Sequence, residues 1–332
     1  MLSGRSQVGW VVSLGALGLV LSLLSIPLAT EAQQAGKVWR IGFISVSYAR
    51  IEDVFFQQLR ELGYVEGHNL VVERRYSEGR AERFAEFAAE LVRRNLDIII
   101  VTTTPAVLAV QNATQTIPIV QPNSLDPVGA GLAVSLARPG GNFTGTTQQA
   151  PDTAAKRLQW LVEAMPHVAT VAVVWNAANP GNAGSWREVQ EAARVLGLHV
   201  QSREVRGPSD FERIFAEMVR ERPDALLLIG DRLTLPHGEE IVHFATQQRL
   251  PSMFDRPDLV TAGGLMSYGA DEEEQWRLAA VLADKILQGA KPADLPLEQP
   301  TKFKFVINLK TAHALGLTIP PHLLVFADEV IR

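Results

Sequence analysis

The sequence contains no cysteine among its 332 residues. Disulfide bonds, zinc–thiolate sites, a thiol nucleophile and a lipid anchor on an N-terminal cysteine are therefore excluded. A basic block is also missing, because the net charge of −5 is spread along the chain. A nucleic-acid partner is therefore not expected. Hydrophobic residues make up 47% of the chain, which is enough to bury a sizeable core.

The motifs of the common α/β enzymes are missing as well. No G-x-S-x-G nucleophile motif and no G-x-x-x-x-G-K-[ST] phosphate loop occur. The turn after the first expected strand is Ser45–Tyr48, which lacks the glycines that let a backbone approach a pyrophosphate. The histidines are scattered, and His237 and His243 are six residues apart, so they do not share a helix face. We therefore expect no catalytic activity, no metal site and no cofactor.

An apolar segment near the N-terminus has the pattern of a targeting signal. Arg5 precedes an apolar stretch from Val8 to Leu28, and small residues occupy positions −3 and −1 of a cut after Ala32. This pattern predicts a secretory signal peptide at residues 1–32 and a periplasmic mature chain that begins near Gln33. An uncleaved membrane anchor is the alternative, because the stretch approaches the ~20 residues that span a bilayer.

From Val38 onward, short apolar runs alternate with amphipathic helical patterns. Strands are expected at Val38–Ser45, Leu70–Tyr76, Asp97–Thr103, Ile117–Gln121, Val171–Trp175, His199–Val205, Ala225–Ile229, Pro251–Phe254, Gly264–Tyr268, Leu295–Gln299 and Phe303–Ile307. Helices are expected at Glu52–Leu62, Ala81–Asn95, Pro105–Ala113, Asp152–Met165, Ser185–Leu196, Ser209–Arg220, Leu233–Gln248 and Asp271–Gln288. This alternation predicts an α/β fold of doubly wound parallel sheets.

The alternation begins again after the turn Pro139–Asn142, so the chain is expected to form two lobes. The C-terminal tail is too short for a third domain and is expected to complete both sheets. We assign 38–148 plus 259–294 to lobe 1, and 149–258 plus 295–332 to lobe 2. Several crossovers then form a hinge, and the carboxyl ends of the strands face a cleft between the lobes.

Polar and aromatic side chains follow the expected strands of both lobes. The candidate ligand-binding residues are Ser45, Ser47, Tyr48, Thr103, Thr104, Asn123, Asp126, Asn176, Asp231, Phe254 and Tyr268. The helix that begins with Pro105 has free N–H groups in its first turn, which suit an anionic group such as a ligand carboxylate. A role in a turn or a solvated loop is the alternative for each residue alone. Glu272–Glu274 is interpreted as the negatively charged first turn of a helix.

Several stretches closely resemble the bacterial ABC transporter substrate-binding protein family that includes tryptophan- and tyrosine-binding members. They are Ala137–Gly145, Leu287–Pro296, Glu298–Phe303, Val306–Ala312 and Gly316–Pro321. The resemblance extends from about Lys37 to the C-terminus. It implies a fold of the periplasmic-binding-protein type I, with two lobes and three crossovers. It also implies delivery of a ligand to a permease with a cytoplasmic ATPase.

The resemblance carries over to individual residues only in part. Family motifs match at Thr104–Ala106, at Asn176, at Asp231 and, with leucine in place of a hydroxyl residue, at Leu125–Val128. Aromatic-binding relatives often have Pro-x-Asp-Asn-Thr where this chain has Ile229–Leu233, so it departs from them at Arg232 and Leu233. The resemblance therefore does not imply an aromatic amino acid as the ligand.

Together these observations predict an extracytoplasmic solute-binding protein of an ABC importer. The candidate ligand is a small, amino-acid-like molecule with a carboxylate, bound in the cleft between the lobes. The expected partners are an inner-membrane permease and its ATPase, with contact to the membrane only through the permease or an uncleaved signal segment. A ligand-sensing module that reports to a membrane receptor is the alternative. An exported enzyme is a third possibility, which the missing catalytic motifs disfavour.

Overall fold

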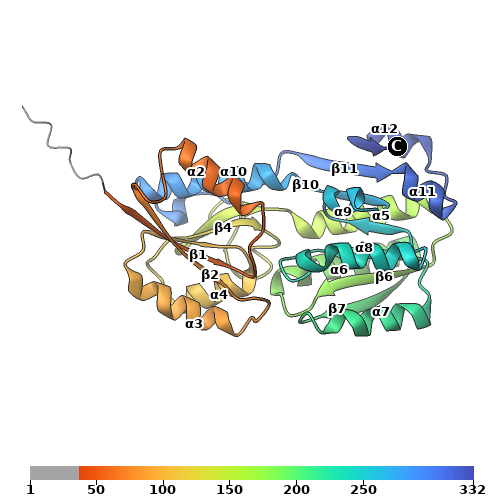
Figure 1. The fold of residues 1–332 in the computed structure, drawn as a ribbon, viewed down its shortest axis with the longest axis horizontal. Coiled ribbons are helices and arrows are strands. Elements are labelled where there is room, and N and C mark those ends of the chain that lie inside the picture. The colour runs from red at the N-terminus through yellow and green to blue at the C-terminus, as the bar shows by residue number, and fades with distance from the viewer. Residues whose placement is uncertain (1–36) are drawn as a thin grey trace, which may run out of the picture. The chain divides into compact units, whose positions relative to one another are not determined.

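The structure, a computed structural model, describes residues 37–332. The predicted signal peptide at residues 1–32, with its cut after Ala32, lies outside the described residues. Across 37–332 no helix combines the length and the apolar character needed to cross a membrane. Two β-sheets, each with helices on both faces, build this part of the chain (Figure 1). The predicted α/β fold with two sheet-based lobes is thus confirmed.

The first sheet consists of five parallel strands in the order β2-β1-β3-β4-β5. Its strands are β1 (Trp39–Ser45), β2 (Leu70–Tyr76), β3 (Ile98–Val101), β4 (Ile119–Ser124) and β5 (Phe143–Thr147). Its helices are α2 (Glu52–Glu61), α3 (Arg83–Leu91), α4 (Thr104–Ala113) and α10 (Glu272–Leu287), with short 3-10 turns at Val92–Arg94 and Pro292–Asp294.

Both faces of the first sheet are covered by apolar helix surfaces. Helices α2 and α10 lie side by side on one face, where Phe55 and Trp276 are fully buried (Figure 1). Helices α3 and α4 cover the other face through residues such as Phe87 and Val107. Because the β3 run Ile98–Val101 contacts both layers, all four of its residues are apolar and buried.

The second sheet has seven strands in the order β12-β11-β10-β9-β8-β6-β7, and only the β10–β11 pair is antiparallel. Its strands are β6 (Thr170–Asn176), β7 (His199–Val205), β8 (Ala225–Ile229), β9 (Ser252–Phe254), β10 (Met266–Ala270), β11 (Phe303–Asn308) and β12 (Glu329–Ile331). Its helices are α5 (Ala150–Ala164), α6 (Ala183–Leu196), α7 (Asp210–Glu221), α8 (Gly238–Gln247), α9 (Pro257–Thr261), α11 (Leu309–Leu315) and α12 (Pro321–Phe326), with 3-10 turns at Pro180–Asn182 and Leu235–His237.

The chain passes between the two sheets at three places, and these correct the predicted lobe boundaries. The passages are at 148–149, at 271 and at 299–302. The prediction placed 259–270 in lobe 1, but β10 pairs with β9 and β11 of the second sheet. The prediction placed 295–298 in lobe 2, but Leu297 is buried in the first core and Glu298 bridges to Thr146.

The structure also differs from the prediction at two strands: one predicted strand does not form, and one observed strand was not predicted. Residues 295–299 form no strand, and their only strand-like contact is the Glu298–Thr146 bridge. Strand β5 was not predicted, because Phe143–Thr147 has one large apolar residue and a glycine. Gly145 is needed there, since a Cβ at this position would lie 2.1 Å from the backbone oxygen of Gln121 in β4.

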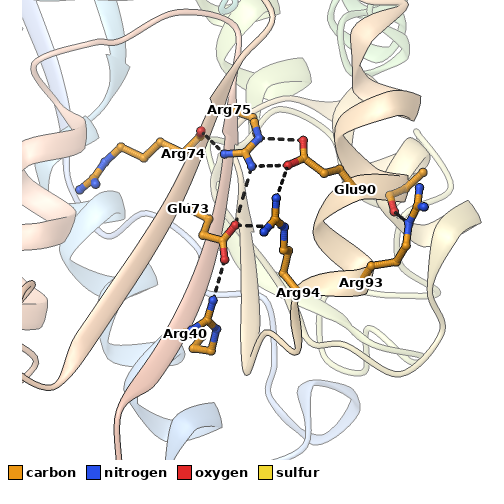
Figure 2. A network of polar contacts seen from close by, with 8 residues as sticks. Arg40, Glu73, Arg74, Arg75, Glu90, Arg93 and Arg94 are labelled. Carbon is orange, nitrogen blue, oxygen red and sulfur yellow. Dashed lines mark hydrogen bonds and ion pairs between the residues drawn. The ribbon is translucent and has the colours of Figure 1, made fainter.

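Charged side chains form a network of ion pairs at the β2 edge of the first sheet. Strand β2 is an edge strand, and Glu73 on it forms ion pairs with Arg40, Arg75 and Arg94. Figure 2 shows that Glu90 of α3 also lies between Arg75 and Arg94. Charged side chains of this kind discourage pairing of an exposed strand edge with another chain.

Candidate ligand-binding site

A pocket lies between the carboxyl ends of strands from both sheets. Lobe 1 contributes the residues after β3, the end of β4 and the start of α10, and lobe 2 contributes the residues after β8 and β9. The lining residues are Thr102, Thr103, Thr104, Gln121, Pro122, Asn123, Leu125, Gln148, Asn179, Leu228, Gly230, Asp231, Arg232, Thr234, Leu235, Asp255, Arg256, Leu259, Ala270 and Glu272. Ligands bind at this edge in open α/β sheets, as the sequence predicted for this fold.

The start of α4 provides hydrogen-bond donors to the pocket. Thr104 is only 1% exposed, and its hydroxyl has no hydrogen-bond partner. Pro105 has no N–H, and the N–H groups of Ala106 and Val107 both donate to the Thr103 carbonyl oxygen at 3.1 Å. In this turn only the hydroxyl and the backbone N–H of Thr104 are therefore left to donate to a ligand. A helix start with all its first N–H groups free offers more donors.

Asp231, directly after β8, fixes the loops of lobe 2. Its Oδ2 accepts hydrogen bonds from Asn176 Nδ2 at 2.7 Å and from Asn179 Nδ2 at 2.9 Å. Its Oδ1 accepts from the backbone N–H groups of Leu233 at 3.0 Å and Thr234 at 3.1 Å. Burial raises the pKa of the carboxyl, although all four donors favour its ionised form. Because these bonds use both oxygens, Asp231 shapes the wall of the pocket and has little capacity left for a ligand.

Arg232 extends from lobe 2 towards lobe 1. Its guanidinium carbon lies 5.0 Å from the ring centre of Trp276 in α10, a cation–π contact. Burial lowers the pKa of Arg232, and the carboxylates of Glu272 and Glu52, both in lobe 1, counteract this. One terminal nitrogen of the guanidinium is buried without a hydrogen-bond partner. In the described chain Arg232 forms no ion pair within 4 Å, so this nitrogen is available to an anionic ligand group.

Three residues of lobe 1 that carry acceptor oxygens line the same pocket. Gln121, which is 1% exposed, has an amide oxygen without a partner, and so has Asn123. The Asn123 amide nitrogen donates to Glu272 Oε1 at 3.3 Å, which leaves its oxygen directed elsewhere. Asn123 has a left-handed backbone with φ of 59°, a conformation that asparagine tolerates better than most residues. We call Gln121 Oε1, Asn123 Oδ1 and the Glu272 carboxylate the acceptor cluster.

Four of the predicted binding residues line this pocket, namely Thr103, Thr104, Asn123 and Asp231. Asn176 lines a smaller adjoining pocket, together with Thr103 and Asp231. The remaining predicted residues, which line neither pocket, are Ser45, Ser47, Tyr48, Asp126, Phe254 and Tyr268.

Residues at the end of β1 are engaged in local contacts. The Ser45 hydroxyl is fully buried, donates to the Ser47 carbonyl oxygen at 3.1 Å and accepts from Thr102 at 2.9 Å. Tyr48 is 60% exposed, and its hydroxyl donates to Asp53 at 2.7 Å. These contacts stabilise the turn after β1 and leave the first-strand residues outside the pocket.

The other three predicted residues outside the pocket make packing contacts or a local hydrogen bond. Phe254 is completely buried in the core of the second sheet. Tyr268 stacks on Phe303 with 5.8 Å between the ring centres. The Asp126 carboxylate accepts from the N–H of Gly129 at 2.8 Å. A residue at a strand end therefore reaches the pocket only when its side chain points away from the core.

The sequence interpretation missed charged members of the pocket. Glu272 was attributed to the helix dipole alone, and Arg232 was noted only as a departure from relatives. Asp255 and Arg256, directly after β9, were not considered. Charged residues within three positions after a buried strand were the available signal, since Arg232 follows β8 and Asp255 and Arg256 follow β9 in this way. Over residues 37–332 no group of three or more His, Asp or Glu side chains is placed to hold a metal ion.

The fold and the pocket define a two-lobed binding protein with a ligand site between the lobes. The model of the family described as "ABC transporter substrate binding protein" matches residues 45–331. The chain belongs to this family, which is extracytoplasmic and non-enzymatic, and it is the substrate-binding protein of an ABC transporter. Its fold matches the type I-like periplasmic binding proteins, as predicted.

Individual relatives agree with this assignment. The chain is 25% identical over 263 residues to the tyrosine-binding protein of Clostridioides difficile, a match that covers 79% of this chain and 75% of the relative. A solved structure from Streptococcus pneumoniae, described as an ABC domain in complex with L-Trp, has 26% identity and a TM-score of 0.81, and covers 88% of this chain and 99% of the other. A conserved domain protein from Vibrio cholerae has 26% identity and a TM-score of 0.82, with coverage of 89% and 100%.

Proposed function

We propose that this chain is a periplasmic solute-binding protein of an ABC importer and that it captures an amino-acid-like ligand bearing a carboxylate. The observation that carries the proposal is that one pocket is lined by strand ends from both sheets. A ligand bound there contacts both lobes, so its binding energy favours the closed arrangement of the lobes. Closure also removes water, which strengthens each polar contact.

The carboxylate lies between Thr104 and Arg232 in this proposal. Thr104 contributes a buried hydroxyl without a partner, and Arg232 contributes a guanidinium nitrogen without one. An unsatisfied buried donor costs ~1–3 kcal/mol, and a carboxylate relieves this cost at both groups. The relatives described as tyrosine-binding and as bound to L-Trp support an amino acid as the class of ligand.

The ligand-loaded protein then delivers its ligand to an inner-membrane permease with a cytoplasmic ATPase. Export depends on the signal peptide of residues 1–32, which is removed near Ala32 and leaves the chain in the periplasm. N-terminal sequencing of the protein recovered from the periplasm tests this part. A first residue near Gln33 supports cleavage, whereas an intact N-terminus in the membrane fraction indicates an anchor.

Native mass spectrometry of the protein purified without denaturation tests the function itself. We expect a co-purified small molecule with a carboxylate, bound one to one. After the ligand is removed by unfolding and refolding, titration followed by tryptophan fluorescence should show saturable binding without chemical change of the ligand. Turnover of the ligand, or a ligand without an anionic group, would contradict the proposal. Loss of uptake on deletion of the gene distinguishes an importer from a sensor.

A further inference from the structure

The charges around the pocket are not balanced. Five charged residues line it, and two are already paired within the protein. Arg256 forms an ion pair with Asp258. Asp255 lies close enough to the buried Arg157 to oppose the lowering of that guanidinium's pKa by burial. Arg232, Asp231 and Glu272 remain, which is one positive charge against two negative charges, because the four donors to Asp231 are uncharged amide groups.

Glu52 is a further carboxyl group near Arg232, and burial raises its pKa while Arg232 lowers it. It is 1% exposed in α2 and lies close enough to Arg232 to affect its charge state. Glu52 Oε2 accepts from the Tyr76 hydroxyl at 3.0 Å, whereas Oε1 has no partner. Arg232 is thus opposed by carboxylates of lobe 1 before any ligand is bound. Because uncompensated buried charge is costly, a ligand with a carboxylate must also bring positive charge.

The acceptor cluster provides a site for that positive charge. Gln121 Oε1 and Asn123 Oδ1 are buried acceptors without a donor, and they accompany the Glu272 carboxylate in the lining. An ammonium or guanidinium group carries several N–H donors and a positive charge, which are what these acceptors lack.

The lining offers no aromatic ring against which an indole or a phenol could stack. Trp276 is completely buried, and the Arg232 guanidinium covers its ring. Phe254 and Tyr268 pack elsewhere. The pocket of this chain is therefore suited to a polar, charged side chain.

We propose that the ligand is an amino acid with a cationic side chain, whose ammonium or guanidinium group binds the acceptor cluster of Gln121, Asn123 and Glu272. This inference rests on the proposed function and specifies the class of ligand for the same site. The two positive groups of such a ligand compensate its own carboxylate and the unpaired carboxylates of the pocket.

Pairs of amino acids that differ only in side-chain charge test the inference. L-Lysine is compared with L-norleucine, and L-arginine with L-citrulline, by calorimetric titration of the refolded, ligand-free protein. L-Tryptophan and L-tyrosine are titrated under the same conditions. We expect at least one cationic member to bind at least about tenfold more tightly than its neutral partner and than either aromatic amino acid.

The matched variants are Glu272→Gln and Glu273→Gln. Both remove one charge from the first turn of α10, but Glu273 lies outside the pocket and its carboxylate faces Arg277. Glu272→Gln should abolish the preference for the cationic ligand, and Glu273→Gln should retain it. The ratio of two affinities within one variant is insensitive to a loss of stability.

The other outcomes overturn the inference in distinguishable ways. Equal binding of cationic and neutral partners, tighter binding of an aromatic amino acid, or equal effects of the two variants would refute the cationic side chain and leave the proposed function standing. Binding of no amino acid at all would refute both, and the co-purified molecule would then identify the ligand class.

Discussion

Replacement of Asp231 should reveal how strongly lobe 2 depends on one buried carboxylate. Its two oxygens accept four hydrogen bonds, from the Asn176 and Asn179 amides and from two backbone N–H groups. Asp231→Ala leaves all four donors unpaired, on residues that are at most 7% exposed. Each unpaired donor costs ~1–3 kcal/mol, and water from the pocket reduces this towards the lower value. We therefore expect a loss of about 4 kcal/mol in the free energy of unfolding.

Asp231→Asn is the sharper variant, because it preserves the shape of the side chain. An asparagine amide has one donor group, which must face either the two side-chain donors or the two backbone donors. Burial outweighs the four donors in setting the pKa of Asp231, so the loss of the negative charge is not what destabilises the variant. The loss of stability arises because the new amide N–H groups face other donors. We expect a loss of about 2–3 kcal/mol.

Urea unfolding of the ligand-free protein, followed by tryptophan fluorescence, measures both changes. Asp152→Asn is the control, because Asp152 is exposed in the first turn of α5 and its replacement should change stability by less than ~0.5 kcal/mol. If Asp231→Asn were as stable as Asp152→Asn, the four contacts would contribute nothing, and Asp231 would be free to bind a ligand instead.

Three further predictions concern the sheet, the pocket and the response to acid. Gly145→Ala should destabilise the fold by about 3 kcal/mol or more in urea unfolding, because the new Cβ meets the Gln121 backbone oxygen, whereas Gly67→Ala, which has open space, should show only the cost of its positive φ. Thr104→Val removes a hydroxyl without a partner, so thermal stability should be retained while ligand affinity falls about threefold to tenfold in calorimetric titration; unchanged affinity would place the ligand elsewhere. Two arginines lower the pKa of Glu90 from 4.5 to about 2 (Figure 2), so its stabilising contribution is present above pH ~4.5 and is lost as the pH falls towards 2. Because Glu90 is partly exposed, Glu90→Gln should cost only about 0.5–1 kcal/mol at pH 7 and nothing near pH 2, as measured by urea unfolding at both values.

Local sequence patterns predicted most of the fold. Apolar runs such as Ile98–Val101 and amphipathic segments such as Glu272–Leu287 carry their signal within a few residues, and these elements are confirmed. Strand β5 was missed because its stability comes from pairing with β4 and with Glu298 rather than from its own composition. The lobe boundary near 259 was wrong for a related reason, since sheet membership depends on partners that are distant in the sequence.

The pocket was predicted in location but only partly in composition. Thr103 and Thr104 reach it because the chain turns there from β3 into α4. Tyr48 and Tyr268 follow strands in the same way, but they are used in contacts with Asp53 and Phe303. Which side of a strand end faces the pocket depends on the packing around it. For Arg232, whose guanidinium extends to a tryptophan of the other lobe, no local pattern gives that information.

Helix α10 lies far along the sequence from the sheet that it covers, and this limits the order in which the protein can fold. The first sheet is complete by residue 147, but one of its faces is covered by Trp276, Ala279 and Ile286, which are synthesised more than a hundred residues later. A fragment ending at residue 148 would expose that apolar face and should aggregate instead of folding. The first lobe is therefore not a self-sufficient domain. The core under α2 and α10 is completed only after most of the second lobe has been made, so its formation depends on contacts of high sequence separation, which form slowly.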